Sequence, residues 1–174
     1  MPVEVKGVIE LRKALRKYSP DLAKGLTKEM GTALKPIVKQ ARTFLPSNDE
    51  VPSNWLASNN PRKFPTYDRA VAAKGVTYKT SPSKPNRRGF RSLAAIFNKT
   101  AAGAIYETAG RKNPNSVFVR NIENKYHNPL KGNDKERGRV IYKAWLNNQG
   151  KAQDAVMKAI EKATDLFNKR SKVK

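Results

Sequence analysis

The longest amphipathic stretch of the chain covers residues 19–45, where apolar side chains recur every three or four positions. Ser19 followed by Pro20 is typical of a helix start, because serine can cap the first turn and proline needs no hydrogen-bonding N–H there. Asp21 adds a negative charge at the positive end of the helix dipole. Pro36 lies inside the predicted helix and is expected to bend it. The apolar face consists of Leu22, Leu26, Met30, Ala33, Ile37, Ala41 and Phe44.

Positive charge gathers on the opposite side of the same predicted helix. At about 100° per residue, its cations fall within about 60° of one another. A face that is merely solvated usually mixes signs, because like charges one turn apart repel each other. A face of one sign favours a polyanion or an acidic protein partner, and both interpretations stay open. These cations, called the basic row below, are Lys24, Lys28, Lys35, Lys39 and Arg42.

Patterns on either side of this helix predict an α+β fold. Residues 8–18 form a short helix by their apolar spacing, and residues 149–170 form the C-terminal helix. Period-2 alternation and apolar runs predict a small antiparallel sheet of about four strands. Its strands are expected at 70–80, with a bulge at Gly75, and at 90–97, 101–108 and 139–145. The alanine-rich residues 93–109 also fit a helix.

We expect a single domain over residues 1–174, with extended loops at 46–69, 81–89 and 111–138. Trp55 and Leu56 are expected to fix the first loop to the core. The other two loops carry paired cations that are candidate contacts to a partner: Arg87, Arg88, Arg111 and Lys112. The C-terminal helix provides a contrast to the basic row, because its polar face mixes signs in pairs such as Asp154 with Lys158 and Asp165 with Lys169.

Charge changes the functional picture more than any motif does. The 174-residue chain carries 36 Lys and Arg against 14 Asp and Glu, which gives a net charge of +22 and a pI near 10.4. That excess favours nucleic acid, an anionic surface or acidic protein neighbours. The absence of cysteine excludes disulfides and thiolate metal sites. We expect neither a signal peptide nor a membrane span.

Catalytic patterns are weak in this sequence. The one histidine, His127, stands in a polar segment without a second base or ligand at a recognisable spacing. Glu107 is an isolated acid, which we expect to pair with Arg111 or with a neighbouring chain. No phosphate-binding glycine loop is present. We therefore expect a protein that is not an enzyme and that uses no cofactor and no metal.

Residues 7–46 read GVIELRKALRKYSPDLAKGLTKEMGTALKPIVKQARTFLP. This stretch resembles the N-terminal half of the neck or tail-completion proteins of long-tailed bacteriophages, most of all those of actinobacterial phages. In that family a short amphipathic helix precedes a long helix with an internal Lys-Pro-Ile-Val-like step, and a small sheet and a final helix follow. The segment AAGAIYETAGR at 101–111 is similar to the family's apolar strand that ends in Glu-x-x-Gly, and the residues from Arg139 onward fit its C-terminal part. The other matching positions are Gly7, Leu11, Leu15, Leu22, Lys35, Pro36, Ile37, Val38, Ala41 and Pro46.

The resemblance implies a structural virion protein of the phage neck that carries no catalytic residues. Its partners would be other copies of itself in a ring, expected to be a hexamer, a head-completion or connector protein, a tail terminator or tail tube protein, and packaged double-stranded DNA. It would be found in the virion, and in the host cytoplasm during assembly. The alternative is a nucleic-acid-binding protein of cellular type without sequence specificity. Few aromatic residues and a large positive charge suit phosphate contacts in both interpretations.

Overall fold

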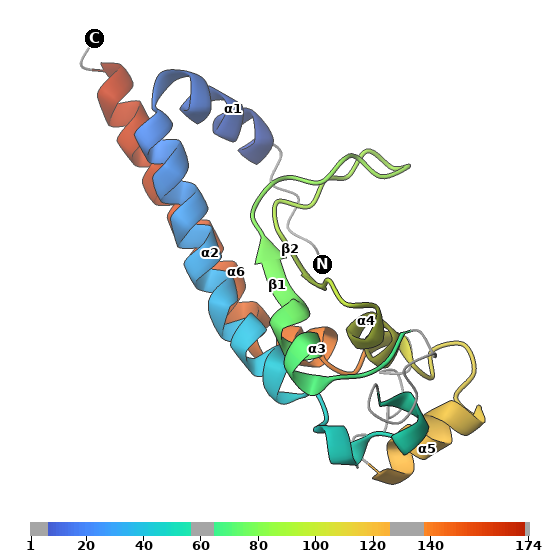
Figure 1. The fold of residues 1–174 in the computed structure, drawn as a ribbon. Helices are drawn as coiled ribbons and strands as arrows, with labels where there is room; N and C mark the ends of the chain where they lie inside the picture. The colour runs from blue at the N-terminus through green and yellow to red at the C-terminus, as the bar shows by residue number, and fades with distance from the viewer. Residues whose placement is uncertain (1–6, 57–64, 126–137, 173–174) are drawn as a thin grey trace. The chain divides into compact units, whose positions relative to one another are not determined.

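The structure is a computed structural model, and it describes residues 7–56, 65–125 and 138–172. Over these ranges the chain is mostly helical, with six α-helices and one two-stranded antiparallel sheet (Figure 1). The helices are α1 (Val8–Tyr18), α2 (Pro20–Thr43), α3 (Arg69–Gly75), α4 (Ala101–Thr108), α5 (Val117–Lys125) and α6 (Ile141–Lys172). The strands are β1 (Val76–Lys79) and β2 (Ala95–Asn98), and two short 3-10 turns, η1 (Asn48–Glu50) and η2 (Ser53–Trp55), follow α2.

The chain divides into two compact units. The first unit comprises Met1–Lys35, Tyr78–Ala95 and Gln149–Lys174, and the second comprises Pro36–Thr77 and Ile96–Asn148. Helices α2 and α6 contribute residues to both units.

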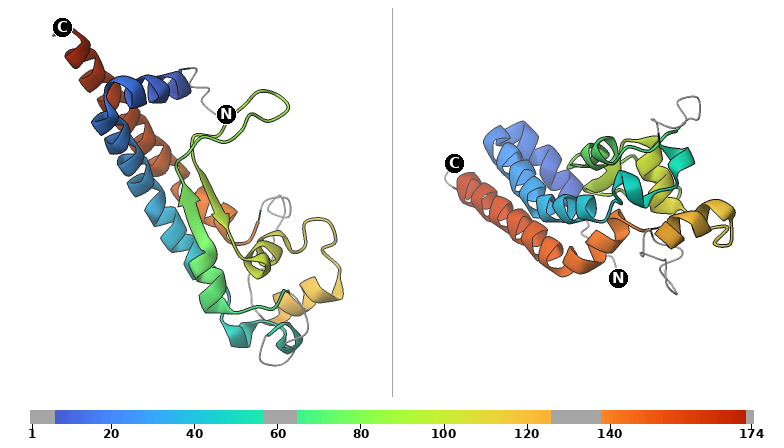
Figure 2. Two further views of the ribbon diagram at one scale, coloured as in Figure 1. Left: turned by 45° about the horizontal axis from the view of Figure 1, so that its top comes forward. Right: turned by 60° about the horizontal axis from the view of Figure 1, so that its bottom comes forward.

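The first unit contains α1, the N-terminal part of α2, the C-terminal part of α6 and the segment Tyr78–Ala95. Within this unit α2 and α6 run alongside each other (Figure 1 and Figure 2). Two exposed ion pairs join them, Lys162 to Glu29 at 2.9 Å and Arg170 to Asp21 at 2.8 Å. Their shared core consists of Val8, Leu15, Leu22, Leu26, Met30, Ala159, Ile160 and Ala163. The predicted helices at 8–18 and 19–45 are therefore confirmed, and the apolar residues of α1 and of the N-terminal part of α2 face this common core.

The second unit packs around Trp55, which fixes the segment after α2 as the sequence predicts. The Trp55 indole is 8% exposed, and its Nε1 donates to the carbonyl oxygen of Pro65 at 2.9 Å. Its ring centre lies 4.9 Å from that of Tyr67 and 5.0 Å from that of Phe118. The Tyr67 hydroxyl donates to the carbonyl oxygen of Pro46 at 2.6 Å.

The prediction of four strands is wrong. Residues 101–108 form helix α4, whose first turn is capped by Thr100 because its hydroxyl accepts from the Gly103 N–H at 3.2 Å. Residues 70–80 are divided between α3 and β1, with no bulged strand, and only Ala95–Asn98 of the predicted strand at 90–97 pairs in the sheet. The predicted strand at 139–145 enters α6, which begins eight residues before the predicted helix at 149–170.

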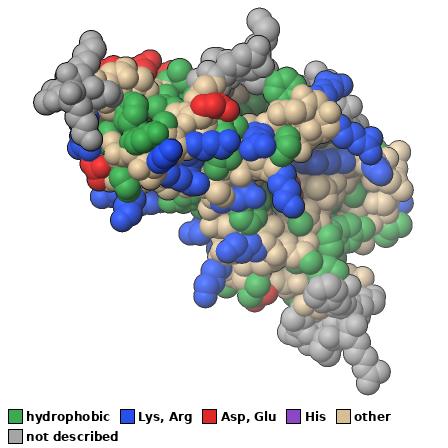
Figure 3. Space-filling view, turned by 90° about the horizontal axis from the view of Figure 1, so that it is seen from above, with side chains coloured by type: hydrophobic (Ala, Val, Ile, Leu, Met, Phe, Trp, Pro, Cys, Tyr) green, Lys and Arg blue, Asp and Glu red, His purple; other side chains and the backbone are tan. Residues whose placement is uncertain are grey.

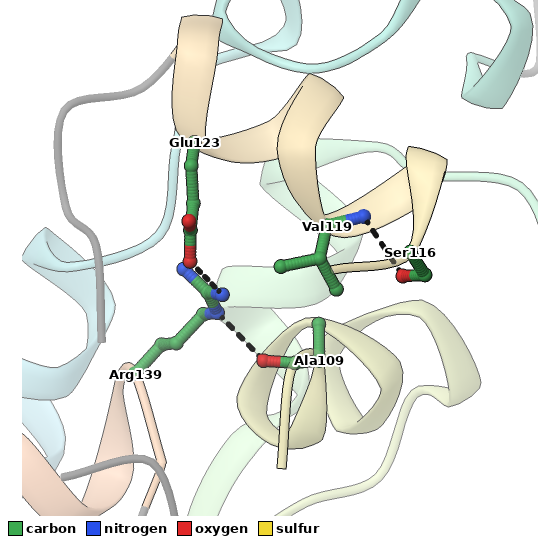
Figure 4. Close-up of polar contacts among 5 residues, drawn as sticks. All are labelled: Ala109, Ser116, Val119, Glu123 and Arg139. Atoms are coloured by element: carbon green, nitrogen blue, oxygen red, sulfur yellow. Dashed lines mark hydrogen bonds and ion pairs between the residues drawn. The ribbon is translucent and has the colours of Figure 1, made fainter. Parts of the chain in front are cut away.

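Part of the predicted loop at 111–138 is helix α5, and residues 126–137, which include His127, lie outside the described residues. Helix α5 begins where the Ser116 hydroxyl accepts from the Val119 N–H at 3.3 Å (Figure 4). Val119 and Ile122, one turn apart, are buried at 3% and 0% exposure. This short apolar stripe is enough to hold a helix once the second unit covers it.

Two charged residues tie the start of α6 to its neighbours in the second unit. Arg139 is buried, and its guanidinium donates to the carbonyl oxygen of Ala109 at 3.0 Å and to the Glu123 carboxylate at 2.7 Å (Figure 4). The Glu107 carboxylate accepts from the backbone N–H groups of Val140, Ile141 and Tyr142 at 2.7, 3.0 and 3.1 Å. Glu107 therefore caps a helix, a role that the sequence did not predict.

Gly103 gives a first prediction about packing in the second unit. A glycine inside a helix usually costs about 1 kcal/mol relative to alanine. At this position, however, a Cβ would collide with the side chain of Asn98, whose Nδ2 donates to the carbonyl oxygen of Ala72 at 3.0 Å. We expect Gly103→Ala to lower the free energy of unfolding by about 1 to 3 kcal/mol in urea denaturation. Gly150→Ala in α6 is the control, because that position is open and alanine should be neutral or stabilising there.

Candidate nucleic-acid interface

The basic row lies on the exposed side of α2, as the sequence predicts. Lys24, Lys28 and Lys35 belong to the first unit, Lys39 and Arg42 belong to the second, and all five side chains are exposed. The buried face of the helix carries Leu22, Leu26, Met30, Leu34, Ile37, Val38 and Ala41.

The two acids of α2 are both occupied by cations of α6. Asp21 and Glu29 are the only acidic residues of α2, and they form the ion pairs with Arg170 and Lys162 described above. The hydrogen bond from Arg170 is the main reason that the pKa of Asp21 is lowered. Because α6 already satisfies these carboxylates, they are not available to neutralise the basic row. The row therefore keeps its positive charge toward solvent.

Arg42 differs from the four lysines of the row because it makes a structural contact. Its Nη2 donates to the carbonyl oxygen of Val76 at 2.9 Å, and this bond attaches the start of β1 to α2 within the second unit. A guanidinium has further donors available after such a bond. Arg42 can therefore contact a partner, but it also has a role within the fold.

The remaining predicted cations lie in different places. Arg87 and Arg88 are exposed in the segment between β1 and β2, in the first unit. Arg111 and Lys112 are exposed after α4, in the second unit. The predicted cations therefore belong to one helix and to two different loops of the chain.

Sequence reasoning missed three exposed residues that flank Arg87 and Arg88. Lys84, Phe90 and Arg91 occupy the same segment. The signal was present in the sequence, because no Asp or Glu occurs between Asp68 and Glu107. On the face drawn in Figure 3, Lys and Arg side chains are spread widely, with few acidic side chains among them.

The described residues give little support for other kinds of site. No group of His, Asp or Glu side chains among them is arranged to hold a metal ion. Within the same ranges no helix is long and apolar enough to cross a membrane. A hollow of about 170 Å³ beside α3 and α4 contains one ionisable side chain, that of Asp68, and no pair of catalytic residues. The residues that line it are Pro65, Thr66, Asp68, Val71, Ala72, Thr100, Ala101 and Ala102. Comparison with family models, curated proteins and solved structures gave no match.

Proposed function

We propose that this protein is a structural virion protein of the bacteriophage neck. It acts as a ring subunit that joins the head-side connector to the tail and surrounds the DNA channel. The observation that carries the proposal is the exposed basic row of α2, whose neighbouring acids are occupied by α6. Such a face suits a polyanion that must slide, because phosphate contacts carry no sequence information.

The order of elements also supports the proposal. A short helix, a long helix with an internal proline, a small sheet and a final helix occur in this order along the chain, with α3 before the sheet and α4 and α5 after it. The neck family that the sequence resembles is expected to have this order. Each subunit has a net charge of +22, so the subunits of a ring repel one another. Anions along the axis of the ring, or acidic protein neighbours, would offset this repulsion and stabilise the ring.

The oligomeric state of the full chain tests this function. Native mass spectrometry and negative-stain electron microscopy should show closed rings, expected to be hexamers, or assemblies bound to tails. A protein that stays monomeric at every concentration and binds free duplex DNA as a monomer would instead support a cellular nucleic-acid-binding protein without sequence specificity.

The basic row gives a second prediction. Replacing Lys28, Lys35 and Lys39 with glutamine removes three exposed charges at little cost in helix propensity. If the row binds DNA, affinity for duplex DNA should fall, and the slope of log affinity against log salt should become shallower by up to about 0.9 for each phosphate that is no longer neutralised. Fluorescence anisotropy across a salt titration measures both quantities.

The control is the triple glutamine variant of Lys151, Lys158 and Lys169, which removes the same charge from exposed positions of α6. A variant of the basic row that loses head-to-tail joining but keeps its DNA affinity would assign the row to an acidic protein neighbour. If the basic-row variant and the control variant have the same DNA affinity and the same efficiency of head-to-tail joining, the row is only a solvated face.

A further inference from the structure

The segment between the two strands forms a hairpin arm, defined here as residues 80–94. Its two limbs run out and back side by side (Figure 1 and Figure 2). At its middle the Ser83 N–H donates to the carbonyl oxygen of Ser92 at 2.9 Å, and the Ser92 N–H donates to the Ser83 hydroxyl at 2.9 Å. The arm belongs to the first unit along its whole length.

Asn86 closes the arm tip, defined as residues 84–91. Its N–H donates to the carbonyl oxygen of Phe90 at 2.9 Å, and its side-chain oxygen accepts from the N–H groups of Arg88 and Phe90 at 2.9 and 3.0 Å. Gly89 has a φ of +79°, a conformation that glycine adopts without strain. The turn is therefore defined by its own hydrogen bonds before any partner binds.

The base of the arm is attached to the core of the first unit. Leu93 and Ala94 pack against the core shared by α1, α2 and α6. The buried Arg12 of α1 donates to the carbonyl oxygen of Leu93 at 3.4 Å. In β1, which leads into the other limb, the Tyr78 ring packs so closely over Gly31 that a Cβ at Gly31 would lie 2.9 Å from the Tyr78 hydroxyl. A fixed base and a closed tip reduce the entropy that binding would otherwise cost.

The arm tip presents only positive charge and one aromatic ring. The side chains of Lys84, Arg87, Arg88 and Arg91 are exposed, and Phe90 is 54% exposed. Among the described residues, these four cations form no ion pair. The charge is uninterrupted, since the nearest acids along the chain are Asp68 and Glu107.

Charge complementarity narrows the choice of partner. A second copy of a chain with a net charge of +22 would be repelled by this tip. An acidic protein pocket could accept the arginines, but lysine is depleted in protein interfaces. Duplex DNA carries about one charge per 1.7 Å of axis, so it can accept every cation of the tip at once. Two-stranded ribbons fit DNA grooves, and proteins that bind the minor groove often insert apolar side chains beside their cations.

We propose that the arm is a DNA-binding element, in which Lys84, Arg87, Arg88 and Arg91 contact phosphates of duplex DNA while Phe90 packs against sugars or bases in a groove. This inference rests on the proposed function in one respect, because that function identifies the DNA as the genome in the channel. It extends that function because it assigns DNA binding to the arm in addition to the basic row.

The test measures binding of a labelled mixed-sequence duplex of about 20 base pairs to the full-length protein, by anisotropy from about 50 to 200 mM salt. The double variant Arg87→Gln and Arg88→Gln should weaken binding by about ten- to a hundredfold, and the slope of log affinity against log salt should become shallower by about 1.8, or about 0.9 for each cation. Phe90→Ala should weaken binding by about five- to tenfold and leave the salt slope unchanged, because it removes no charge.

Matched variants test whether the loss of binding is specific to the arm, because they remove the same charge or a similar exposed ring from positions outside it. Lys158→Gln with Lys169→Gln removes the same charge from α6, and Tyr18→Ala removes an aromatic ring that is 65% exposed elsewhere in the first unit. Both controls should bind the duplex nearly as the unchanged protein does. Circular dichroism should be the same for all variants, because the substituted side chains are exposed.

The proposal is overturned if the double arginine variant binds the duplex as tightly, and with the same salt slope, as the double lysine control. It is also overturned if that variant keeps its DNA affinity but loses head-to-tail joining, which would assign the arm to an acidic protein. Failure of the proposed neck function would show as the absence of rings. The duplex assay on purified protein does not depend on ring formation, so the two failures can be distinguished.

Discussion

Replacing Arg139 with alanine is expected to lower the free energy of unfolding by about 3 to 5 kcal/mol. The Arg139 side chain is 0% exposed, whereas that of its partner Glu123 is 29% exposed. The substitution leaves a cavity beneath the Tyr106 ring, whose centre lies 5.8 Å from the guanidinium carbon. It also removes the donor to the carbonyl oxygen of Ala109 and the cation that faces the Glu123 carboxylate. Urea denaturation followed by circular dichroism measures the decrease.

Two further variants make this prediction specific to the buried guanidinium. Arg139→Lys should have an intermediate stability, because one ammonium group cannot reproduce both bonds at the same geometry. Arg120→Ala removes an exposed guanidinium from α5 and should change the free energy of unfolding by less than about 0.5 kcal/mol. An Arg139→Ala protein as stable as the Arg120→Ala protein would show that the buried pair contributes nothing to the second unit.

The helices with a full apolar stripe could be predicted from the sequence. Helices α1 and α2, and the part of α6 after residue 149, each repeat apolar residues over three turns or more. At that length the helical period separates clearly from the period of a strand. Trp55 was also predictable as an anchor, because a single large indole in a proline-rich segment usually packs against the core.

The strands were mispredicted where short apolar runs fit both periods. Val140 and Ala144 belong to an alternating pattern, but they are also one helical turn apart, and both are buried in the structure. The helix is selected by the Glu107 carboxylate, which lies 33 residues earlier in the chain and accepts from the Val140 N–H. A local pattern cannot contain such a long-range bond. Helix α4 also depends on a long-range bond. Asn98 Oδ1 accepts from the hydroxyl of the capping residue Thr100 at 2.7 Å, while Asn98 Nδ2 donates to the carbonyl oxygen of Ala72, 26 residues earlier.

The candidate interface was partly predictable for a similar reason. Exposure of the basic row follows from helix geometry alone, so the four lysines and Arg42 were placed on the solvent side correctly. The bond from Arg42 to the Val76 carbonyl oxygen joins residues 34 positions apart and leaves no sequence signal. Arg87 and Arg88 could be identified as loop cations, whereas their arrangement with Lys84, Phe90 and Arg91 depends on the turn that Asn86 closes.

Glu107 gives the second prediction with a large effect. Its carboxylate accepts three backbone N–H groups at the start of α6, which a helix otherwise leaves without partners. Glu107→Ala is expected to lower the free energy of unfolding by about 2 to 3 kcal/mol, because a cap is removed and the Val140 N–H is buried. Glu107→Gln should cause roughly half that decrease, because the amide keeps one acceptor oxygen. Glu161→Ala, which removes an exposed glutamate of α6, is the control and should be nearly neutral.

The stability of the protein should also depend on pH through this group. Burial raises the pKa of the Glu107 carboxyl, against the opposing effects of the backbone N–H groups of α6 and the charge of Arg111. Between the ordinary glutamate pKa and the raised value, the folded protein binds more protons at Glu107 than the unfolded chain does. The contribution of Glu107 to stability therefore falls as pH rises through that window. Urea denaturation of the wild-type protein and of Glu107→Gln over a pH series should show that the variant lacks this component. Identical pH profiles, together with a neutral Glu107→Ala, would contradict the assignment of Glu107 as the cap of α6.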